Sequence, residues 1–439
     1  MSSNIKIVVT DMQSSSVIFS NCFLPKDGKL RHCRVTVKDT RTEKIELVSD
    51  AEYGQIIFSE TFGNSSTTND ESKVDEITTF ECAGHILSPG FIDIQLNGCF
   101  GVDFSNPSLM KEDILRVATH LLRFGVTCFC PTMVSSSKES YAKLIPLIGG
   151  LCLEDRSSTK PVDRASLWGM HLEGPFFSAS KRGAHEAQCI IEEVKVNSLS
   201  DVYDRGVGEL FNAGVAITTL APELPGAINQ IRDLCKHGII VSMGHTDATI
   251  NDGLKAIKNG ASLITHLFNA MRPFHHREPG LLGVLCSDEK DEIYYSIIAD
   301  GLHSHPTSVK MAYAISKNVV LVTDAMSALG LGDGEHSLGA EKVTVKNSKA
   351  VISGTDTLAG SVASMDSCVR SFHKFTGCSI YEALKAATEN PARVLKQNTG
   401  LGVITVGRPA DFVILDSELN VLRTIVAGSV VFSNDADKA

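Results

Sequence analysis

The sequence predicts an α/β protein, a (β/α)8 TIM barrel with a small β-sandwich domain built from the N- and C-terminal segments. Three observations support this. Short apolar runs alternate with helical patterns eight times from residue 91 onward, polar residues follow the ends of most runs, and both termini show the short apolar runs typical of strands. We therefore expect a β-sandwich domain over 1–90 and 396–439 and a barrel over 91–395.

Composition narrows the class of protein. The 439 residues are 43% hydrophobic and carry a formal net charge of −10, which favours a large buried core and argues against a nucleic-acid or membrane-surface binder. No run reaches the roughly 18 apolar residues of a membrane span. The start, MSSNIKIVVTDMQ, lacks the layout of a signal peptide, so we expect a cytoplasmic protein with reduced thiols and an unused glycosylation sequon at Asn64.

The first 90 residues contain the strand-like runs SSVIFSNCFL, HCRVTVKD, EKIELVS, YGQIIFSE and ITTFECAGHILSPG. The polar segment 62–76 interrupts them and predicts an exposed loop or insertion. After Pro89-Gly90 the pattern changes. The apolar residues of 108–124 recur at helical spacing, and apolar runs then alternate with such helices.

The eight barrel runs are FIDIQLNG, GVTCFCPTMV, LWGMHLEG, GVAITTLAPE, GIIVSMGHT, SLITHLFNA, YYSIIADGLH and VVLVTDA. Cys128 and Cys130 lie two apart in the second run with no partner motif, so buried thiols are favoured over a zinc knuckle. Helical patterns at 361–375 and 379–395 follow the eighth run, and β periodicity then returns. GLGDGE, from Gly330, reads as a flexible loop. DTLAGS (356–361) is either a ligand-binding segment or a helix N-cap.

Functional side chains of such barrels lie at the C-terminal ends of the strands. The polar residues of the eight runs fall there: Gln95, Asn97, His171, Glu173, Glu223, His245, His266, Asp300, His303 and Asp324. One such residue alone would be read as a satisfied structural group. Their shared position around a ring predicts a site.

Two consecutive strands end in His245 and His266, with an amphipathic segment between them. A parallel βαβ unit brings these two histidines to the same edge of the sheet. With Glu173 they supply two imidazole nitrogens and one carboxylate oxygen, a set that leaves positions open on a divalent metal. We therefore predict a catalytic metal site.

Asp324, at the end of the eighth run, is the expected acid/base for a metal-activated water. His185, in KRGAHE, is placed to donate to a substrate carbonyl. Arg277, in HHREPG, suits a phosphate, with Lys181 and Arg182 as alternatives. No lysine ends any run, which disfavours a Schiff-base aldolase and a carbamylated-lysine binuclear centre.

The motifs PGFIDIQLNG, HLEGPF, GHTDAT, THLFNAM, REPG, DGLH, VTDA and GRPADFVILD resemble those of the N-acetylglucosamine-6-phosphate deacetylases of the amidohydrolase superfamily. The resemblance covers nearly the whole chain and is least distinctive over about residues 1–80. It implies the barrel with a terminal β-sandwich, and hydrolysis of N-acetylglucosamine 6-phosphate to glucosamine 6-phosphate and acetate, in amino-sugar catabolism and recycling.

The resemblance also implies residue roles. Glu173, His245 and His266 match the metal ligands, and Asp324 matches the acid/base. The implied substrate contacts are Ala184, His185, Asn269, Ala270, Arg277, His303, Leu358, Ala359 and Gly360. The arginine matching Arg277 reaches the phosphate in the neighbouring subunit's site, which implies a homodimer.

One departure from the superfamily concerns the metal count. Many members carry an HxH motif on the first strand that binds a second metal, whereas this chain has Gln95-Leu96-Asn97. Amides are poor zinc ligands, so we expect one divalent metal per subunit, with zinc the expected ion. We expect Gln95 and Asn97 to hydrogen-bond beside the metal and count them among the substrate-binding residues. A second metal remains an alternative, because some family members carry two.

Two other functions remain open at this point. A related amidohydrolase could act on another N-acyl or cyclic amide, which the dependence of turnover on the phosphate would decide. A catalytically silent barrel could serve as a binding or scaffold protein. Loss of a ligand or of the acid/base would be its signature, and all four residues are present.

Overall fold

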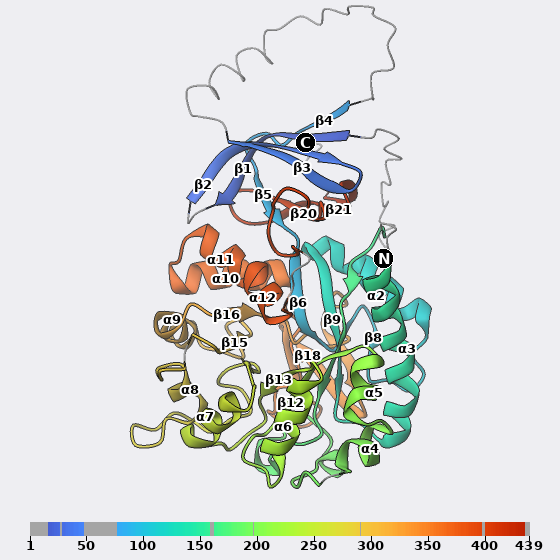
Figure 1. Cartoon of the computed structure of the whole chain (residues 1–439), viewed down its shortest axis with the longest axis vertical. Helices are drawn as coiled ribbons and strands as arrows, with labels where there is room; N and C mark the ends of the chain where they lie inside the picture. The colour runs from blue at the N-terminus through green and yellow to red at the C-terminus, as the bar shows by residue number, and fades with distance from the viewer. Residues whose placement is uncertain are drawn as a thin grey trace, which may run out of the picture.

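A computed structural model describes residues 16–26, 29–47, 77–158, 162–195, 197–289, 291–396 and 400–434. The predicted run YGQIIFSE, the polar segment 62–76 and the sequon at Asn64 lie outside these residues. The predicted fold class is confirmed: a parallel barrel stands beside a mixed, curled sheet built from both ends of the chain (Figure 1). No described helix has the length and apolar character needed to cross a membrane.

All eight predicted runs form parallel barrel strands. The third run is split into two short strands around Trp168-Gly169. The barrel strands are β6 (Phe91–Leu96), β9 (Val126–Val134), β10 (Ser166–Leu167) with β11 (Met170–Glu173), β12 (Val215–Leu220), β13 (Ile240–Met243), β14 (Leu263–Ile264), β15 (Tyr294–Ile297) and β16 (Val319–Leu321). A parallel bridge between Leu96 and Ala325 brings the last strand back to the first.

Helices of the barrel layer follow the strands and bury their apolar faces against them. They are α2 (Lys111–Leu121), α3 (Lys138–Ser157), α4 (Ser198–Tyr203), α5 (Val207–Asn212), α6 (Ala227–Lys236), α7 (Ile250–Lys258), α8 (Gly280–Val284) and α9 (Pro306–Ile315). The predicted helix between the two histidines is α7. It begins at a capping box, in which Thr249 and Asp252 exchange side-chain and backbone hydrogen bonds.

The predicted helical patterns after the eighth strand are α10 (Met365–Thr376), α11 (Ile380–Ala387) and α12 (Glu389–Val394). Figure 1 shows them between the barrel and the terminal sheet. The N-cap of α10 is Ser364, so DTLAGS is not the cap of that helix.

An antiparallel meander between β16 and α10 was not predicted. Its strands are β17 (Gly334–Leu338), β18 (Glu341–Lys346) and β19 (Lys349–Ile352). GLGDGE leads into it rather than forming only a flexible loop. A small hairpin, β7 (Gly98–Cys99) with β8 (Val102–Asp103), follows the first barrel strand. Asp103 Oδ2 accepts a hydrogen bond from the backbone of Gly339 at 2.6 Å, which ties the meander to this hairpin.

The terminal sheet joins strands from both ends of the chain in the order β22-β21-β20-β5-β1-β2-β3, with β4 paired to β1. Its strands are β1 (Ser16–Lys26), β2 (Lys29–Lys38), β3 (Arg41–Leu47), β4 (Ile77–Glu81), β5 (Ile86–Pro89), β20 (Phe412–Leu415), β21 (Val421–Val426) and β22 (Ser429–Ser433). Phe19 and Phe412 meet edge to face in a core of the sheet's own. The division at 90/91 and 395/396 remains our proposal for the domain boundaries.

Gly90 joins the terminal sheet to the barrel. A Cβ at this position would lie 2.0 Å from Thr127 Oγ1, so only glycine fits where β5 leads into β6. Because β6 starts beside the terminal sheet and all barrel strands run parallel to it, their C-terminal ends lie at the far end of the barrel (Figure 1).

The twelve cysteines are free thiols, and nine of them are buried, including Cys128 and Cys130 on β9.

Candidate active site and metal centre

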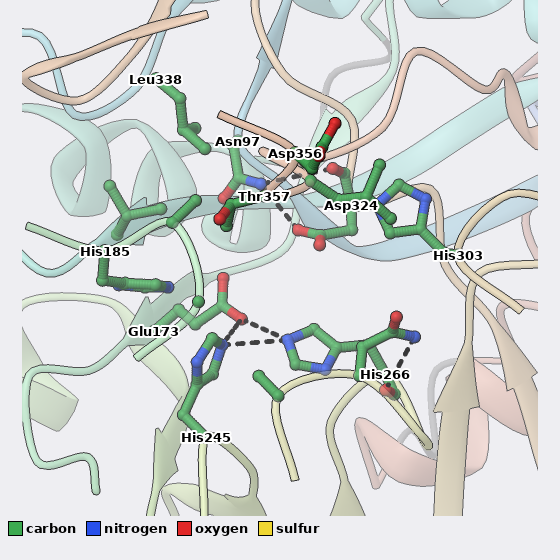
Figure 2. Close-up of a pocket in the computed structure, with 17 residues that line it drawn as sticks. Asn97, Glu173, His185, His245, His266, His303, Asp324, Leu338, Asp356 and Thr357 are labelled. Carbon is green, nitrogen blue, oxygen red and sulfur yellow. Dashed lines mark hydrogen bonds and ion pairs between the residues drawn. The ribbon is translucent and has the colours of Figure 1, made fainter. Parts of the chain in front are cut away.

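A cavity of about 370 Å³ opens at the C-terminal ends of the barrel strands. Its wall combines residues from the strand ends with loops that follow them. It is lined by Asn97, Val134, Glu173, Gly183, Ala184, His185, His245, His266, Asn269, Ala270, His303, Asp324, Leu338, Asp356, Thr357, Leu358 and Gly360 (Figure 2). Six of the ten polar residues predicted from the strand ends therefore meet in this cavity, whereas Gln95, His171, Glu223 and Asp300 do not line it. His171 is hydrogen-bonded to Thr219, and Glu223 accepts from Thr246 and Asp247.

Three ligand atoms converge in this cavity. Glu173 Oε1 lies 3.2 Å from His245 Nε2 and 3.1 Å from His266 Nε2, and the two nitrogens lie 3.0 Å apart. All three side chains are buried. Zinc ligands at about 2.0–2.2 Å in a tetrahedral arrangement are separated by roughly 3.3–3.6 Å. The observed spacing is close to that value.

The hydrogen bonds of His245 show which of its nitrogens is available. His245 Nδ1 lies 3.0 Å from the carbonyl oxygen of Lys181. Because a carbonyl only accepts, Nδ1 carries the proton and Nε2 keeps a lone pair. Burial raises the pKa of Glu173, but hydrogen bonds with His245 and His266 outweigh it and hold that pKa well below its ordinary value. An anionic oxygen and the Nε2 lone pair of His245 thus face one point beside His266 Nε2, which suits a divalent cation.

A second group of potential metal ligands shares Glu173 and His245 with the first. Single ligand atoms of Glu173, His185 and His245 also lie within 4.8 Å of one another. However, the backbone N–H of Ser135 donates to His185 Nδ1 at 3.1 Å. The proton of the neutral ring must then lie on Nε2, which is a donor and not a ligand. His266, whose Nε2 lies 3.1 Å from Glu173 Oε1 and 3.0 Å from His245 Nε2, fits the third position better than His185.

His185 is well placed to donate a hydrogen bond into the cavity. Burial lowers its pKa to about 3, so the ring is neutral near pH 7. The Ser135 hydroxyl lies 2.9 Å from the same Nδ1 that accepts the Ser135 backbone N–H. These contacts orient the ring and leave the Nε2 proton as its one donor.

Asp324 faces the ligand cluster from the other side of the cavity (Figure 2). Its Oδ1 accepts hydrogen bonds from Asn97 Nδ2 at 2.7 Å and from Gln95 Nε2 at 3.2 Å. No described residue hydrogen-bonds its Oδ2. Burial, and then the charge of Glu173, raises the pKa of Asp324 to about 7. Such a carboxyl can exchange a proton near neutral pH.

Gln95 connects the two sides of the site. Its Nε2 donates to Glu173 Oε1 at 2.8 Å as well as to Asp324 Oδ1. Carboxylates only accept hydrogen bonds, so the amide nitrogen must point toward both. Gln95 itself is buried and does not line the cavity.

Three of these residues have a strained backbone. His245, His266 and Asp324 have φ values of 51°, 30° and 48°, in the left-handed region that non-glycine residues seldom adopt. Such conformations cost on the order of 1–3 kcal/mol each and persist where the surroundings hold them. They are typical of functional sites.

His303 lines the cavity with a fixed tautomer. Its Nδ1 lies 2.7 Å from Asp300 Oδ2, and Asp300 Oδ1 accepts the backbone N–H groups of Leu302 and His303. Burial raises the pKa of Asp300, but its hydrogen bonds with His303 hold it below the ordinary value. His303 Nδ1 therefore donates to a carboxylate, and Nε2 can accept from a ligand hydroxyl.

Several residues that were predicted to contact the substrate or its phosphate do not line the cavity. Ala359 is buried between two lining residues, and its N–H donates to the carbonyl oxygen of Ala350. Arg277 is exposed on the loop after β14 and does not line the cavity. Lys181 lies 3.8 Å from Asp247, and Arg182 donates to the carbonyl of His185. No lysine or arginine is found among the described lining residues.

Asp356 and Thr357 belong to DTLAGS, for which ligand binding was one of the two predicted roles, and both line the cavity. Three lining residues were not predicted: Val134, Gly183 and Leu338. Val134 ends a predicted strand and Gly183 adjoins the predicted contact Ala184, so the sequence carried a signal for these two. Leu338 belongs to the unpredicted meander, and no motif marked it.

Comparisons with known proteins agree with this geometry. Residues 86–431 match the amidohydrolase family. The chain is 40% identical over 432 residues to the N-acetylglucosamine-6-phosphate deacetylase of Caenorhabditis elegans, covering 97% of this chain and 96% of that one. It is 46% identical over 357 residues to that of Bos taurus, covering 80% and 85%.

A solved structure is also similar. The deacetylase variant from Mycobacterium smegmatis in complex with N-acetyl-D-glucosamine-6-phosphate superposes with a TM-score of 0.77 at 27% identity, covering 95% of this chain and all of that one.

Proposed function

The chain belongs to the amidohydrolase family and, within it, to the N-acetylglucosamine-6-phosphate deacetylases, and on this premise we propose that it hydrolyses N-acetylglucosamine 6-phosphate to glucosamine 6-phosphate and acetate. One observation carries the proposal. The Glu173, His245 and His266 ligand atoms meet within 3.0–3.2 Å of one another, opposite an Asp324 whose pKa is raised to about 7.

Glu173, His245 and His266 would hold one divalent metal, with zinc the proposed ion. Bound there, it would polarise the acetyl carbonyl and lower the pKa of a coordinated water from about 15.7 toward 7. The position of the Gln95 amide supports a single metal. Its Nε2 occupies the space between the Glu173 and Asp324 carboxylates, at 2.8 and 3.2 Å.

The chain's own residues supply the proton transfers. Asp324 accepts the proton of the attacking water at Oδ2, because Oδ1 already accepts from Asn97 and Gln95. It then delivers this proton to the departing amine nitrogen. His185 donates from Nε2 to the carbonyl oxygen as negative charge develops there.

The remaining wall would hold the sugar. His303, Asn269, Ala270, Ala184 and Gly360 lie within one cavity with the reacting groups, as does Leu358. We propose that His303 Nε2 accepts from a sugar hydroxyl. Ala359 and Arg277 remain proposed contacts.

The phosphate contact is proposed to come from a second subunit. No described lining residue of this cavity is cationic, whereas Arg277 stands exposed on its loop. In a homodimer it would reach the neighbouring site and bind phosphate bidentately. Arg277→Ala should then raise KM for the phosphorylated sugar and leave the weak turnover of the unphosphorylated sugar unchanged. Equal loss with both substrates would contradict this role.

The function is tested with purified full-length protein. Acetate release from N-acetylglucosamine 6-phosphate is measured beside metal content, with the unphosphorylated sugar and another N-acyl amide as comparison substrates. We expect about one equivalent of metal per chain and a strong preference for the phosphorylated sugar. A metal-loaded protein that releases no acetate from it would overturn the proposal.

A further inference from the structure

Asp93 is a buried carboxyl that the proposed reaction does not use. It lies on β6, two residues before Gln95, and its exposed fraction is 0%. No cation pairs with it among the described residues. Its Oδ2 accepts from Thr323 Oγ1 at 2.5 Å, and its Oδ1 lies 3.2 Å from the N–H of Gln95 and 3.4 Å from that of Thr323. The three donor groups thus belong to Gln95 and Thr323, which are hydrogen-bonded to Asp324 and adjacent to it in the chain, respectively.

Burial raises the pKa of Asp93 to about 7, although its hydrogen bonds act in the opposite direction. Burying a carboxyl without a cation is unfavourable unless hydrogen bonds compensate for the lost hydration, and here Thr323 and Gln95 supply them. The shortest hydrogen bond of Asp93 comes from Thr323, the residue that directly precedes Asp324.

The Thr323 hydroxyl acts both as a hydrogen-bond donor and as an acceptor. Its Oγ1 donates to Asp93 and accepts from the N–H of Ala325 at 3.2 Å. The residue between these two contacts is Asp324, whose φ is 48°. The hydroxyl therefore holds the chain on both sides of a strained residue.

Backbone contacts complete this arrangement. The N–H of Asp324 donates to the carbonyl of Gln95 at 2.9 Å, and its carbonyl accepts from Ser361 at 2.8 Å. The Ser361 hydroxyl donates to the carbonyl of Thr323 at 2.5 Å. None of these contacts involves Glu173, His245 or His266, which come from β11 and from the segments directly after β13 and β14.

We propose that Asp93 and Thr323 form a positioning pair that holds Asp324 in the backbone conformation needed for proton transfer. This inference rests on the proposed acid/base role of Asp324. The pair acts through Asp324 and does not touch the substrate. Its loss should therefore lower kcat while KM and metal content stay unchanged, because the hydrogen bonds of the Thr323 hydroxyl and the Asp93 carboxylate reach neither the proposed ligands nor the residues proposed to hold the sugar.

The test uses isosteric changes at Thr323. Thr323→Val removes the hydroxyl and keeps the volume. Misplacing a reacting group by about 1 Å can cost a factor on the order of 10², so we expect kcat to fall about 10- to 100-fold. Thr323→Ser restores the hydroxyl and should recover most of the loss.

Thr218→Val is the matched control. Thr218 is a buried threonine of β12 whose Oγ1 has no hydrogen-bond partner among the described residues. The same substitution there should leave kcat, KM and metal content near the wild-type values. Should Thr323→Val not fold, Asp93→Asn is the second variant, and it should show the same selective loss of kcat.

The outcomes are distinguishable. A selective loss of kcat in Thr323→Val with rescue in Thr323→Ser supports the positioning pair. Wild-type kcat in Thr323→Val, or a loss of kcat that comes with loss of metal or a rise in KM, would overturn it. Near-normal turnover of Asp324→Asn would instead overturn the proposed function of Asp324.

Discussion

The two sides of the cavity are built on different physical principles. The ligand half, which consists of Glu173, His245 and His266, brings three lone-pair atoms within 3.2 Å of one another. In the proton half, which consists of Asp324, Asn97 and Gln95, hydrogen bonds from amides to carboxylates already hold Asp324 Oδ1. In the proposed function a bound cation would complete the ligand half, whereas the chain alone preorganises the proton half.

In the proposed reaction, this contrast separates metal binding from proton transfer. The ligand half comes from β11 and the segments directly after β13 and β14, and the proton half comes from the end of β6 and the segment after β16. Among the described side chains, Gln95 is the member of the proton half that hydrogen-bonds both to Asp324 and to Glu173 of the ligand half. Damage to either half should therefore give a distinct signature, and the predictions below use this difference.

The largest effect is expected from the ligand half. Glu173→Gln removes the anionic ligand, so the protein should lose most of its metal. A metal that supplies several kcal/mol of transition-state stabilisation is worth a factor on the order of 10³ or more in rate. Metal analysis and acetate release check this result. Glu193→Gln, at an exposed glutamate, is the control, and full metal content in Glu173→Gln would contradict the ligand assignment.

Asp324→Asn should show the opposite signature. Turnover should fall by about 10² to 10⁴, the usual worth of general acid–base catalysis, while metal content stays at the wild-type level. Parallel loss of metal would mean that the two halves are not separable.

The same residue predicts a pH dependence. Asp324 must be deprotonated to accept a proton, and its pKa is raised to about 7, so activity should rise with pH through this region and be lost below it. A bound cation favours the charged carboxylate and moves the midpoint down. The pH profile of kcat/KM should therefore have an ascending limb with its midpoint no higher than about 7. Asp324→Asn should lack that limb.

A smaller effect is expected at His185, and it sharpens the choice of ligands. His185→Ala should lower kcat by about 10² to 10³ with metal retained, because a donor to the developing oxyanion is lost. His185→Gln supplies an amide donor and should recover part of this loss. His266→Ala should instead lose metal. If metal is lost from the His185 variants and retained in His266→Ala, the group of Glu173, His185 and His245 is the correct one.

The smallest effect is expected in the mobility of the two halves after a chelator removes the metal, whereas the loss of activity itself should match that of Glu173→Gln. Without a cation, the ligand half should loosen and the proton half should not. Hydrogen exchange measured by mass spectrometry should rise in peptides covering 241–247 and 263–268, and stay unchanged in those covering 92–97 and 321–326. A uniform rise would show that the proton half also depends on the metal.

The strand-end residues could be predicted because the alternation of strands and helices is a local property of the sequence. Alternating apolar runs and helices specify parallel strands, and parallel strands present their C-terminal ends on one face. His245, His266, Glu173 and Asp324 could thus be assigned to one site before any distance was known. The terminal strands were equally clear, although their curled sheet was anticipated as a sandwich.

Other features had no local signal. The β17–β19 meander that carries Leu338 was missed because its polar and glycine-rich start resembles a loop. The tautomer of His185 depends on the Ser135 backbone, 50 positions away. The exposed position of Arg277 leaves its phosphate contact a proposal.

The sequence by itself therefore determined the barrel, the terminal β-strands and the place of Glu173, His245, His266 and Asp324 at one end of the barrel, because these depend on periodicity and on position within a strand. Only the tertiary structure decided how those groups are held. Asp93 and Thr323 are 230 positions apart and meet only where the last barrel strand closes on the first. Hydrogen bonds across such a closure depend on the register of the whole sheet, which no single segment of the chain encodes.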